Sequence, residues 1–223
     1  AQYTVPIPCY ICEADNTCDA EYCSHCAAPM ALAHQARSQD VRPRVVAVIG
    51  ASGAGKTVYL GMLTDMLSRQ TSGLQLLVRG AFSISLQQTT VAALARCQFP
   101  QKTPNEPERW NWVHCQIRRP RQKQPLELIM PDMAGEALLE EIQHPRSYRV
   151  VNSFLRRCSA AVVLIDATTL RETSAEHDYF TMKLLTHLSE LKSDDAKKGW
   201  GKRPVALVLS KADQCDTCMD DPI

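Results

Sequence analysis

The residues that most clearly carry chemistry are Gly50-Ala51-Ser52-Gly53-Ala54-Gly55-Lys56-Thr57, a glycine-rich segment that ends in a Lys-Thr pair. Glycine lets the backbone curl tightly enough for several N–H groups to point at one spot. An apolar run, Val45–Ile49, precedes the segment and a helical pattern follows it. The first turn of that helix adds unpaired N–H groups and a positive dipole end. The G-x-x-x-x-G-K-[ST] spacing in this context predicts a loop that binds nucleotide phosphates.

Two side chains of this loop have separate tasks in the predicted site. The Lys56 ammonium is a point charge for the β- and γ-phosphate oxygens, and the Thr57 hydroxyl is a ligand for Mg²⁺. The alternative is a glycine-rich turn with a chance Lys-Thr, which the flanking strand and helix patterns disfavour. The residues expected to contact the nucleotide are Gly50, Ser52, Gly53, Ala54, Gly55, Lys56, Thr57 and Val58.

A second motif follows the apolar run Leu126–Met130, where Asp132 and Gly135 form a D-x-x-G pattern. An Asp at the end of a strand beside the phosphate loop can hold Mg²⁺, usually through a water molecule. A glycine three residues later lets the backbone N–H approach the γ-phosphate. This pattern is weak alone, but its place after a strand and downstream of the phosphate loop makes it informative.

The third motif is Ser210-Lys211-Ala212-Asp213, directly after the apolar run Val205–Leu209. The Asp213 carboxylate can accept hydrogen bonds from both N1–H and the exocyclic N2–H of guanine, a donor pair that adenine lacks. The Lys211 stem can lie along the base or the ribose. Alone, the segment would indicate a surface turn; in order with the other two motifs it predicts guanine recognition.

Four of the ten cysteines form two C-x-x-C pairs near the N-terminus: Cys9, Cys12, Cys23 and Cys26. Four thiolates at this spacing predict a structural zinc site, which leaves no open position for catalysis. The segment is too short to bury a core of its own, so metal binding would replace the core. Cys18 and His25 are alternative ligands that we expect to be bystanders. The competing interpretation is a mobile arm with reduced, unliganded cysteines.

The charged residues of the N-terminal cysteine segment, called the zinc module below, indicate which class of partner it can bind. Residues 1–36 contain neither Lys nor Arg but several acidic residues, which argues against contact with a nucleic-acid backbone. We expect the module to dock a protein partner or simply to stabilise the chain. The formal net charge of +1 over the whole chain gives no general attraction to nucleic acid or to an anionic membrane.

The composition indicates the class of protein and the cellular compartment that we expect. The chain has 223 residues, of which 45% are hydrophobic, enough for a large domain with a small module. No stretch reaches the roughly 20 apolar residues of a membrane span, and the N-terminus lacks the apolar core of a signal peptide. A phosphate-binding loop with many cysteines is typical of a reducing compartment, so we expect a cytoplasmic protein.

Apolar runs alternate with helical patterns along the larger part of the chain, which predicts an α/β fold with a mostly parallel sheet covered on two faces. We assign a zinc-ribbon-like module to residues 1–36, a linker to 37–44 and the α/β domain to 45–223. The predicted strands are 45–49, 74–78, 112–117, 126–130, 160–165 and 205–209. The predicted helices are 56–69, 85–97, 147–158 and 176–192.

These three motifs, in this order from Val45 to Asp213, resemble the TRAFAC class of P-loop GTPases, which includes the Ras-like proteins. The phosphate loop and the D-x-x-G motif match fully, while Ser210 replaces the usual Asn or Thr. The preceding pair of cysteine knuckles resembles the bacterial double-GTPase proteins, which are thought to act in multi-protein regulatory or defence systems. The resemblance implies the three-layer P-loop fold, GTP/GDP with Mg²⁺ as ligands, and protein partners; the oligomeric state is left open.

Three departures from the family pattern matter. The switch I threonine, a Mg²⁺ and γ-phosphate ligand, corresponds to Thr103, with Thr89 and Thr90 as alternatives, and the long stretch before it predicts an inserted strand and helix. After the switch II Gly135, the usual Gln is Glu136, which can accept a hydrogen bond from the attacking water but repels the γ-phosphate. The chain stops at Ile223 before the family's last guanine loop, strand and helix, so we expect a fragment.

The resemblance implies that Lys56, Thr103, Gly135 and Glu136 carry catalysis. The favoured interpretation is a GTP-binding switch with slow hydrolysis, because no arginine finger is evident in cis and a partner would have to supply one. A second interpretation is a nucleotide-binding scaffold with little turnover that docks partners through its zinc module. A third, a P-loop ATPase or kinase, is disfavoured by the Ser-Lys-Ala-Asp segment. The tail pair Cys215 and Cys218 is expected to be free thiols.

Overall fold

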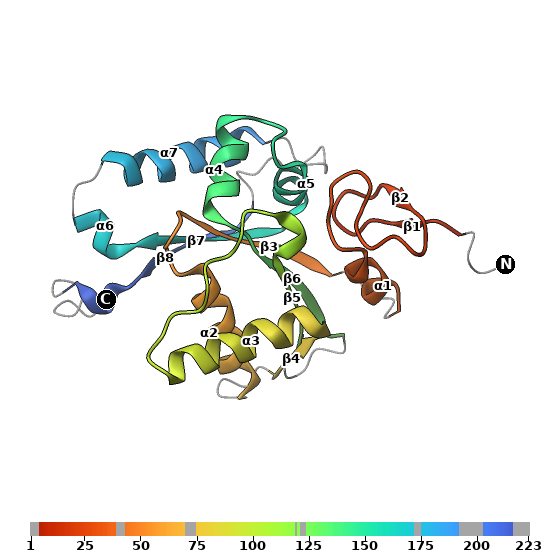
Figure 1. Ribbon diagram of the computed structural model, residues 1–223, viewed down its shortest axis with the longest axis horizontal. Helices are drawn as coiled ribbons and strands as arrows, with labels where there is room; N and C mark the ends of the chain where they lie inside the picture. The colour runs from red at the N-terminus through yellow and green to blue at the C-terminus, as the bar shows by residue number, and fades with distance from the viewer. Residues whose placement is uncertain are drawn as a thin grey trace.

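The computed structural model describes residues 5–38, 43–69, 75–118, 120, 124–171, 175–191 and 203–215. Among these residues, six strands form one sheet in the order β4-β5-β6-β3-β7-β8 (Figure 1). The chain from β6 through β3 and β7 to β8 is parallel, whereas β4-β5 and β5-β6 are antiparallel. The strands are β3 (Arg44–Gly50), β4 (Gln75–Arg79), β5 (Asn111–Arg118), β6 (Leu126–Asp132), β7 (Ala160–Asp166) and β8 (Val205–Ser210).

Helices cover both faces of this sheet. Figure 1 shows α2 and α3 on one face and α4, α5 and α7 on the other, with α6 directly after β7. The α/β fold with a mostly parallel sheet between two helical layers is therefore confirmed. The helices are α2 (Lys56–Ser68), α3 (Gly80–Ala95), α4 (Gly135–Gln143), α5 (Arg149–Arg157), α6 (Ala167–Arg171) and α7 (Ala175–Glu190), with 3₁₀ turns η2 (Pro107–Arg109) and η4 (Ala212–Gln214).

The distribution of apolar side chains around each helix explains which face of the helix is buried. In α5 the apolar residues Val150, Val151, Phe154 and Leu155 are buried, while the arginines of the helix lie on its other side. Phe154 meets Trp112 of β5 edge to face, with ring centroids 6.1 Å apart, a favoured aromatic arrangement. The parallel strands β3, β6 and β7 are largely buried, which accounts for their nearly continuous apolar sequence, whereas the edge strand β8 is apolar but mostly exposed in the described residues.

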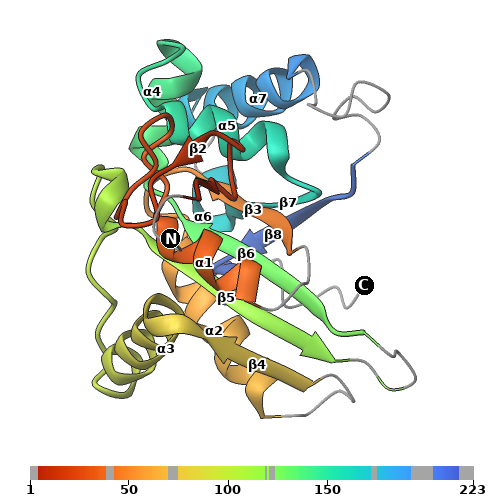
Figure 2. The same ribbon diagram turned by 90° about the vertical axis from the view of Figure 1, so that its right-hand side faces the viewer.

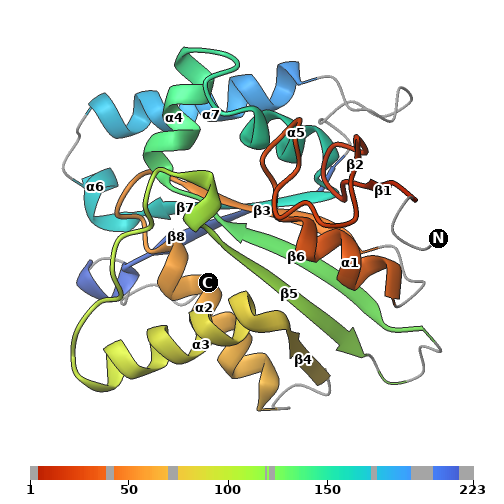
Figure 3. The same cartoon turned by 45° about the vertical axis from the view of Figure 1, so that its right-hand side comes forward.

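The N-terminal module packs against one end of the sheet. It contains the antiparallel pair β1 (Ile7–Pro8) and β2 (Asp15–Asn16), followed by α1 (Met30–Ser38). Figures 2 and 3 show α1 lying beside β5 and β6. The buried residues Ile11, Met30 and Leu32 belong to the same apolar cluster as Trp110 and Trp112. The module therefore shares its core with the larger domain.

Several element boundaries differ from the sequence prediction. The inserted strand and helix are confirmed as β4 and α3, but α3 begins at Gly80, five residues before the predicted start at residue 85. Gly80 has φ +74°, a conformation that lets the chain turn sharply from strand into helix. Helices α1, α4 and α6 were not predicted. Helix α1 runs to Ser38, two residues past the predicted end of the module at 36, and residues 39–42 of the predicted linker lie outside the described part.

None of the helices in the described residues is long and apolar enough to cross a membrane.

Candidate functional site

The parallel strands bring the three sequence motifs to one edge of the sheet. Gly50, Asp132, Asp166 and Ser210 are the last residues of β3, β6, β7 and β8, which are neighbours in the sheet. The carboxyl ends of parallel strands are where ligands bind in open α/β sheets. A cavity of about 800 Å³ lies at this edge and is lined by residues of all three motifs.

The phosphate loop has the backbone that its glycines predict. Gly53 and Gly55 have φ +77° and +82°, in the left-handed region that favours glycine. Gly55 directly precedes α2, so the free N–H groups of the first helical turn face the cavity together with those of the loop. The cavity is lined by Ser52, Gly53, Gly55, Lys56, Thr57 and Val58, whereas Gly50 and Ala54 are buried and are not part of its lining.

Lys56 is held inside the loop by backbone carbonyls. Its ammonium donates hydrogen bonds to Gly50 O at 3.0 Å and to Ala51 O at 2.9 Å. Burial lowers the Lys56 pKa to about 8, although the charges of Asp132 and Glu136 act in the opposite direction. A bound phosphate would add the negative charge that keeps this ammonium protonated.

Thr57, Thr103 and Asp132 converge on one point. Thr57 Oγ1 donates to Asp132 Oδ2 at 3.0 Å, Thr103 Oγ1 donates to the same oxygen at 3.0 Å, and the two hydroxyl oxygens are 3.1 Å apart. Adjacent ligands of an octahedral Mg²⁺ ion lie about 3 Å apart, and Mg²⁺ takes oxygen ligands. These residues therefore fit a magnesium site, with Asp132 near enough to bind directly or through a water molecule.

The alternative switch I threonines lie elsewhere. Thr89 Oγ1 donates to Ser85 O within α3, and Thr90 is buried against Gly61 of α2. Of the three candidates, Thr103 alone lines the cavity.

Gly135 and Glu136 lie directly against the phosphate loop. A Cβ atom on Gly135 would come within 2.5 Å of the Ser52 backbone nitrogen, so the D-x-x-G glycine is required for this close approach. Ser52 Oγ donates to Glu136 Oε1 at 2.7 Å, and the Lys102 ammonium forms an ion pair with the same oxygen. Partial burial raises the Glu136 pKa, but the hydrogen bonds from Lys102 and Ser52 outweigh it, so the pKa is lowered overall.

Lys211 and Asp213 lie at the β8 end of the cavity. Asp213 is exposed in η4 and lines the cavity beside Lys211. The Lys211 ammonium lies 2.5 Å from Asp166 Oδ2 at the end of β7. Burial raises the Asp166 pKa, but hydrogen bonds from Lys211 and Thr168 lower it more, so the carboxylate stays ionised.

The sequence analysis missed Asp166, although a signal was present. Asp166 ends the buried strand β7 and lies opposite Ser210 in the register with β8, so it was bound to reach the same edge of the sheet. By pairing with Lys211 it fixes the stem that was predicted to lie along the base.

The four paired cysteines form one cluster whose sulfur atoms all lie within 4.8 Å of one another. Cys9 Sγ and Cys26 Sγ are 3.7 Å apart, and Cys12 Sγ and Cys23 Sγ are 3.5 Å apart. A tetrahedral zinc ion with Zn–S bonds of about 2.3 Å needs sulfurs about 3.8 Å apart. The cluster therefore fits Zn²⁺, and Cys18 and His25 do not belong to it.

Backbone donors support this cluster. Ile11 N–H donates to Cys9 Sγ at 3.3 Å and His25 N–H to Cys23 Sγ at 3.4 Å, as expected of knuckles whose amides face thiolates. A hydrogen bond from Cys26 lowers the pKa of Cys9 to about 5, whereas burial raises that of Cys12 to about 12. Without a cation the four crowded thiols cannot all ionise, because their negative charges would repel one another. A bound Zn²⁺ ion would balance that negative charge.

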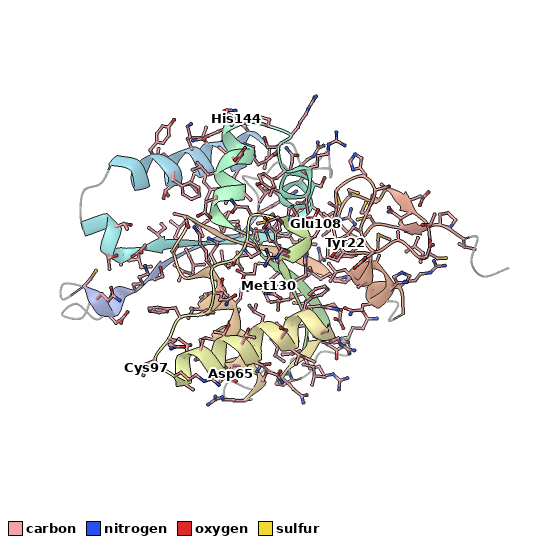
Figure 4. All side chains as sticks on the ribbon, in the orientation of Figure 1. Tyr22, Asp65, Cys97, Glu108, Met130 and His144 are labelled. Atoms are coloured by element: carbon pink, nitrogen blue, oxygen red, sulfur yellow. The ribbon has the colours of Figure 1, made fainter. Side chains whose placement is uncertain are left out.

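Trp110 connects the zinc module with the segment that carries Thr103, and the sequence analysis missed it. Its indole N–H donates to Pro104 O at 2.8 Å, and its side chain is 1% exposed. From the module, Tyr22 Oη donates to Glu108 O at 3.4 Å, and Figure 4 shows the two labelled residues side by side. The available sign that this loop is anchored was a tryptophan that follows three closely spaced prolines.

The tail cysteines are separate from this loop. Cys215 is buried apart from the zinc cluster, and Cys218 lies outside the described residues.

Comparison with known proteins yields one family. The family model described as Double-GTPase 2 matches residues 44–222. No curated protein matches the sequence. Among solved structures, the Roco2 RocCORdC protein of Methanosarcina barkeri bound to GDP matches with 13% identity and a TM-score of 0.36. The match covers 82% of this chain and 38% of that one.

We expect removal of zinc to loosen the Thr103 segment as well as the module, because both pack on Trp110. A strong chelator should lower the melting temperature, and tryptophan fluorescence should shift to longer wavelength as Trp110 becomes exposed. Elemental analysis of the folded protein should give one zinc per chain. Cys12→Ser should reproduce the effect of the chelator, whereas Cys97→Ser, at an exposed free thiol, should not. A folded protein without stoichiometric zinc would contradict the assignment.

Proposed function

Because the chain belongs to the Double-GTPase 2 family, we propose that it binds GTP with Mg²⁺ and hydrolyses it to GDP and phosphate as a molecular switch. The observation that carries the proposal is a single cavity with two chemically distinct ends. One end has the oxygen cluster of Thr57, Thr103 and Asp132, and the other has Lys211 and Asp213. The first suits a metal-bound triphosphate and the second suits guanine.

The residues at the phosphate end explain how binding would change the surface. Mg²⁺, when bound, would neutralise phosphate charge beside Thr57 and Asp132. Thr103 would turn its hydroxyl from Asp132 toward the metal, and the Gly135 N–H would meet the γ-phosphate. Loss of that phosphate would release both segments, as in other nucleotide switches.

Hydrolysis is proposed to be slow because of Glu136. Its carboxylate can accept a hydrogen bond from an attacking water molecule, but it cannot donate one to the γ-phosphate. Its negative charge also opposes the charge of that phosphate, and the Lys102 ion pair compensates only in part because both side chains are partly exposed to solvent. A protein partner that supplies an arginine would raise the rate, by up to roughly 10³–10⁵ for such a residue.

A panel of GTP, ATP and XTP with Mg²⁺ tests the base assignment by thermal shift. We expect GTP to stabilise the protein most, because only guanine offers Asp213 two donors. Asp213→Asn should move the preference toward XTP, and Lys56→Ala should abolish stabilisation by every nucleotide. Gln214→Ala, next to Asp213 at the same end of the cavity, is a matched control that should keep the guanine preference. Equal stabilisation by ATP and GTP would favour an ATPase or kinase instead.

Single-turnover release of phosphate tests hydrolysis. We expect a slow but measurable rate in the wild type, lost in Asp132→Ala because the metal would no longer be held. Glu136→Gln should be faster than the wild type, since the amide removes a negative charge and adds a donor. A rate that does not depend on Asp132 would arise from a contaminant, and the absence of any release would favour the scaffold interpretation.

A second candidate, the nucleotide-binding scaffold that docks a partner, is supported by a cavity of about 620 Å³ between the zinc knuckles and α5. Its wall carries Arg149 and Arg156, seven residues apart on one side of α5, or about 10 Å along the helix. His25 and Arg146 add to it. The buried carboxylate that lines it, Glu141, is already occupied by backbone N–H groups. We propose that the cavity receives an acidic segment of a partner protein.

Charge reversal tests this docking site. A short fluorescein-labelled polyglutamate peptide should bind the wild type in fluorescence polarisation, with an affinity that falls as salt rises. Arg149→Glu should weaken binding severalfold, whereas Arg96→Glu, at the exposed end of α3, should not. Equal weakening by both variants would indicate non-specific attraction. Competition by inorganic phosphate at the same strength would indicate a site for small anions only.

A further inference from the structure

One carboxylate oxygen joins the three segments that surround the phosphate end of the cavity. Glu136 Oε1, at the start of α4, accepts a hydrogen bond from Ser52 Oγ of the phosphate loop at 2.7 Å. It also forms the ion pair with Lys102, which directly precedes Thr103. Lys102 therefore lies beside the point where a γ-phosphate would sit, and it lines the same cavity as Lys56 and Thr57.

Fold stability does not account for this ion pair. The Lys102 side chain is 70% exposed and that of Glu136 is 34% exposed, and ion pairs between exposed groups contribute little to stability. Neither side chain belongs to the apolar core. The pair does, however, hold a flexible ammonium group at the mouth of the phosphate cavity.

Electrostatics gives this ammonium a task. With a triphosphate bound, the γ-phosphate would enter a space already bordered by Asp132 and Glu136. Lys56 is engaged with the carbonyls of Gly50 and Ala51 at the base of the loop. A second cation at the opening would offset the added charge where it develops during phosphoryl transfer.

We propose that Lys102 is a catalytic cation for the γ-phosphate, supplied in cis by the segment that carries Thr103, and that Glu136 holds this ammonium at the mouth of the cavity until a triphosphate binds. The proposal rests on the proposed GTPase function. It revises the expectation that a cation would have to come from a partner, because a lysine ammonium serves as a point charge although it lacks the fork of arginine.

In this reaction the water oxygen forms a bond to the γ-phosphorus while the bond from that phosphorus to the β–γ bridging oxygen breaks. The electron pair of the broken bond leaves with GDP, and the water proton passes to the released phosphate. Lys102 donates hydrogen bonds to the γ-phosphate oxygens throughout and keeps its own proton. Glu136 gives up its contact with Lys102 as the phosphate takes over that role.

The sequence couples this contact to the metal site. Because Lys102 and Thr103 are consecutive, one movement of the segment would bring the ammonium to the phosphate and the hydroxyl to Mg²⁺. On the other side the segment is held at Pro104 O by the buried Trp110. The residue before the pair, Gln101, also lines the cavity and, like Phe99 and Lys102, is exposed, so packing in the core does not oppose a shift of these residues about that anchor.

Affinity for a triphosphate relative to a diphosphate tests the proposal without requiring turnover. We expect Lys102→Ala to weaken binding of a fluorescent non-hydrolysable GTP analogue about tenfold or more, the usual effect of losing a hydrogen bond to a charged group. GDP affinity should stay within about twofold, which also reports correct folding. Lys102→Arg should keep most of the triphosphate affinity. Lys183→Ala on α7, where the lysine stacks over Tyr179 outside the cavity, should match the wild type.

Single-turnover hydrolysis by Lys102→Ala should also fall about 10²-fold or more, as when one charge-stabilising donor is lost. Equal weakening of triphosphate and diphosphate binding, no change in either, or tighter triphosphate binding would each overturn the proposal; the last would mean that the ion pair closes the cavity. A wild type that prefers no guanine nucleotide would instead overturn the proposed function itself. The two failures are therefore distinguishable.

Discussion

The structure of the site depends on the buried carboxylate of Asp132. Only 1% of this residue is exposed, and its oxygens accept hydrogen bonds from Thr57 and Thr103. Burial raises its pKa, whereas the two hydroxyl donors and Lys56 act to lower it. Strand pairing opposes Asp132 to Val48, so the register between β6 and β3 decides how far the carboxylate lies from the phosphate loop. One interaction thus connects the sheet, the loop and the Thr103 segment.

The zinc module has a structural reason to lie where it does. Its apolar residues share a core with Trp110 and Trp112, and Trp110 holds Pro104, the residue after Thr103. A module of this size cannot bury a core alone, so the neighbouring sheet, together with the zinc ion that the four cysteines would hold, takes the place of one. As a result, the four cysteines support the wall from which Lys102 and Thr103 reach the cavity.

The chemistry of the site could be predicted from the sequence where it depends on short spacing. The phosphate loop, the D-x-x-G motif and the cysteine pairs each fix their geometry within a few residues. The contacts of Lys102 with Glu136, of Lys211 with Asp166 and of Trp110 with the module depend instead on which strands are neighbours in the sheet, and no local pattern encodes that. Helices α1 and α4 are nine residues long, and α4 lacks a side-chain cap at its N-terminus; α5 shares both features but could be predicted because its buried apolar residues contrast with its arginines. A short helix without a cap gives little sequence signal.

Glu136 also explains why this site differs from one with glutamine at the same position. Glu136 Oε1 already contacts both Ser52 and Lys102, so a water molecule would have to use the other carboxylate oxygen, and the like charge of the γ-phosphate would oppose it there. In the proposed mechanism the γ-phosphate would therefore compete with Glu136 for the Lys102 ammonium. Two competing partners for one ammonium can serve a two-state switch, because the ligand then changes which state has the lower free energy. On this proposal, the glutamate at position 136, where the family pattern has glutamine, would place the switch in an ion pair between two segments of the chain.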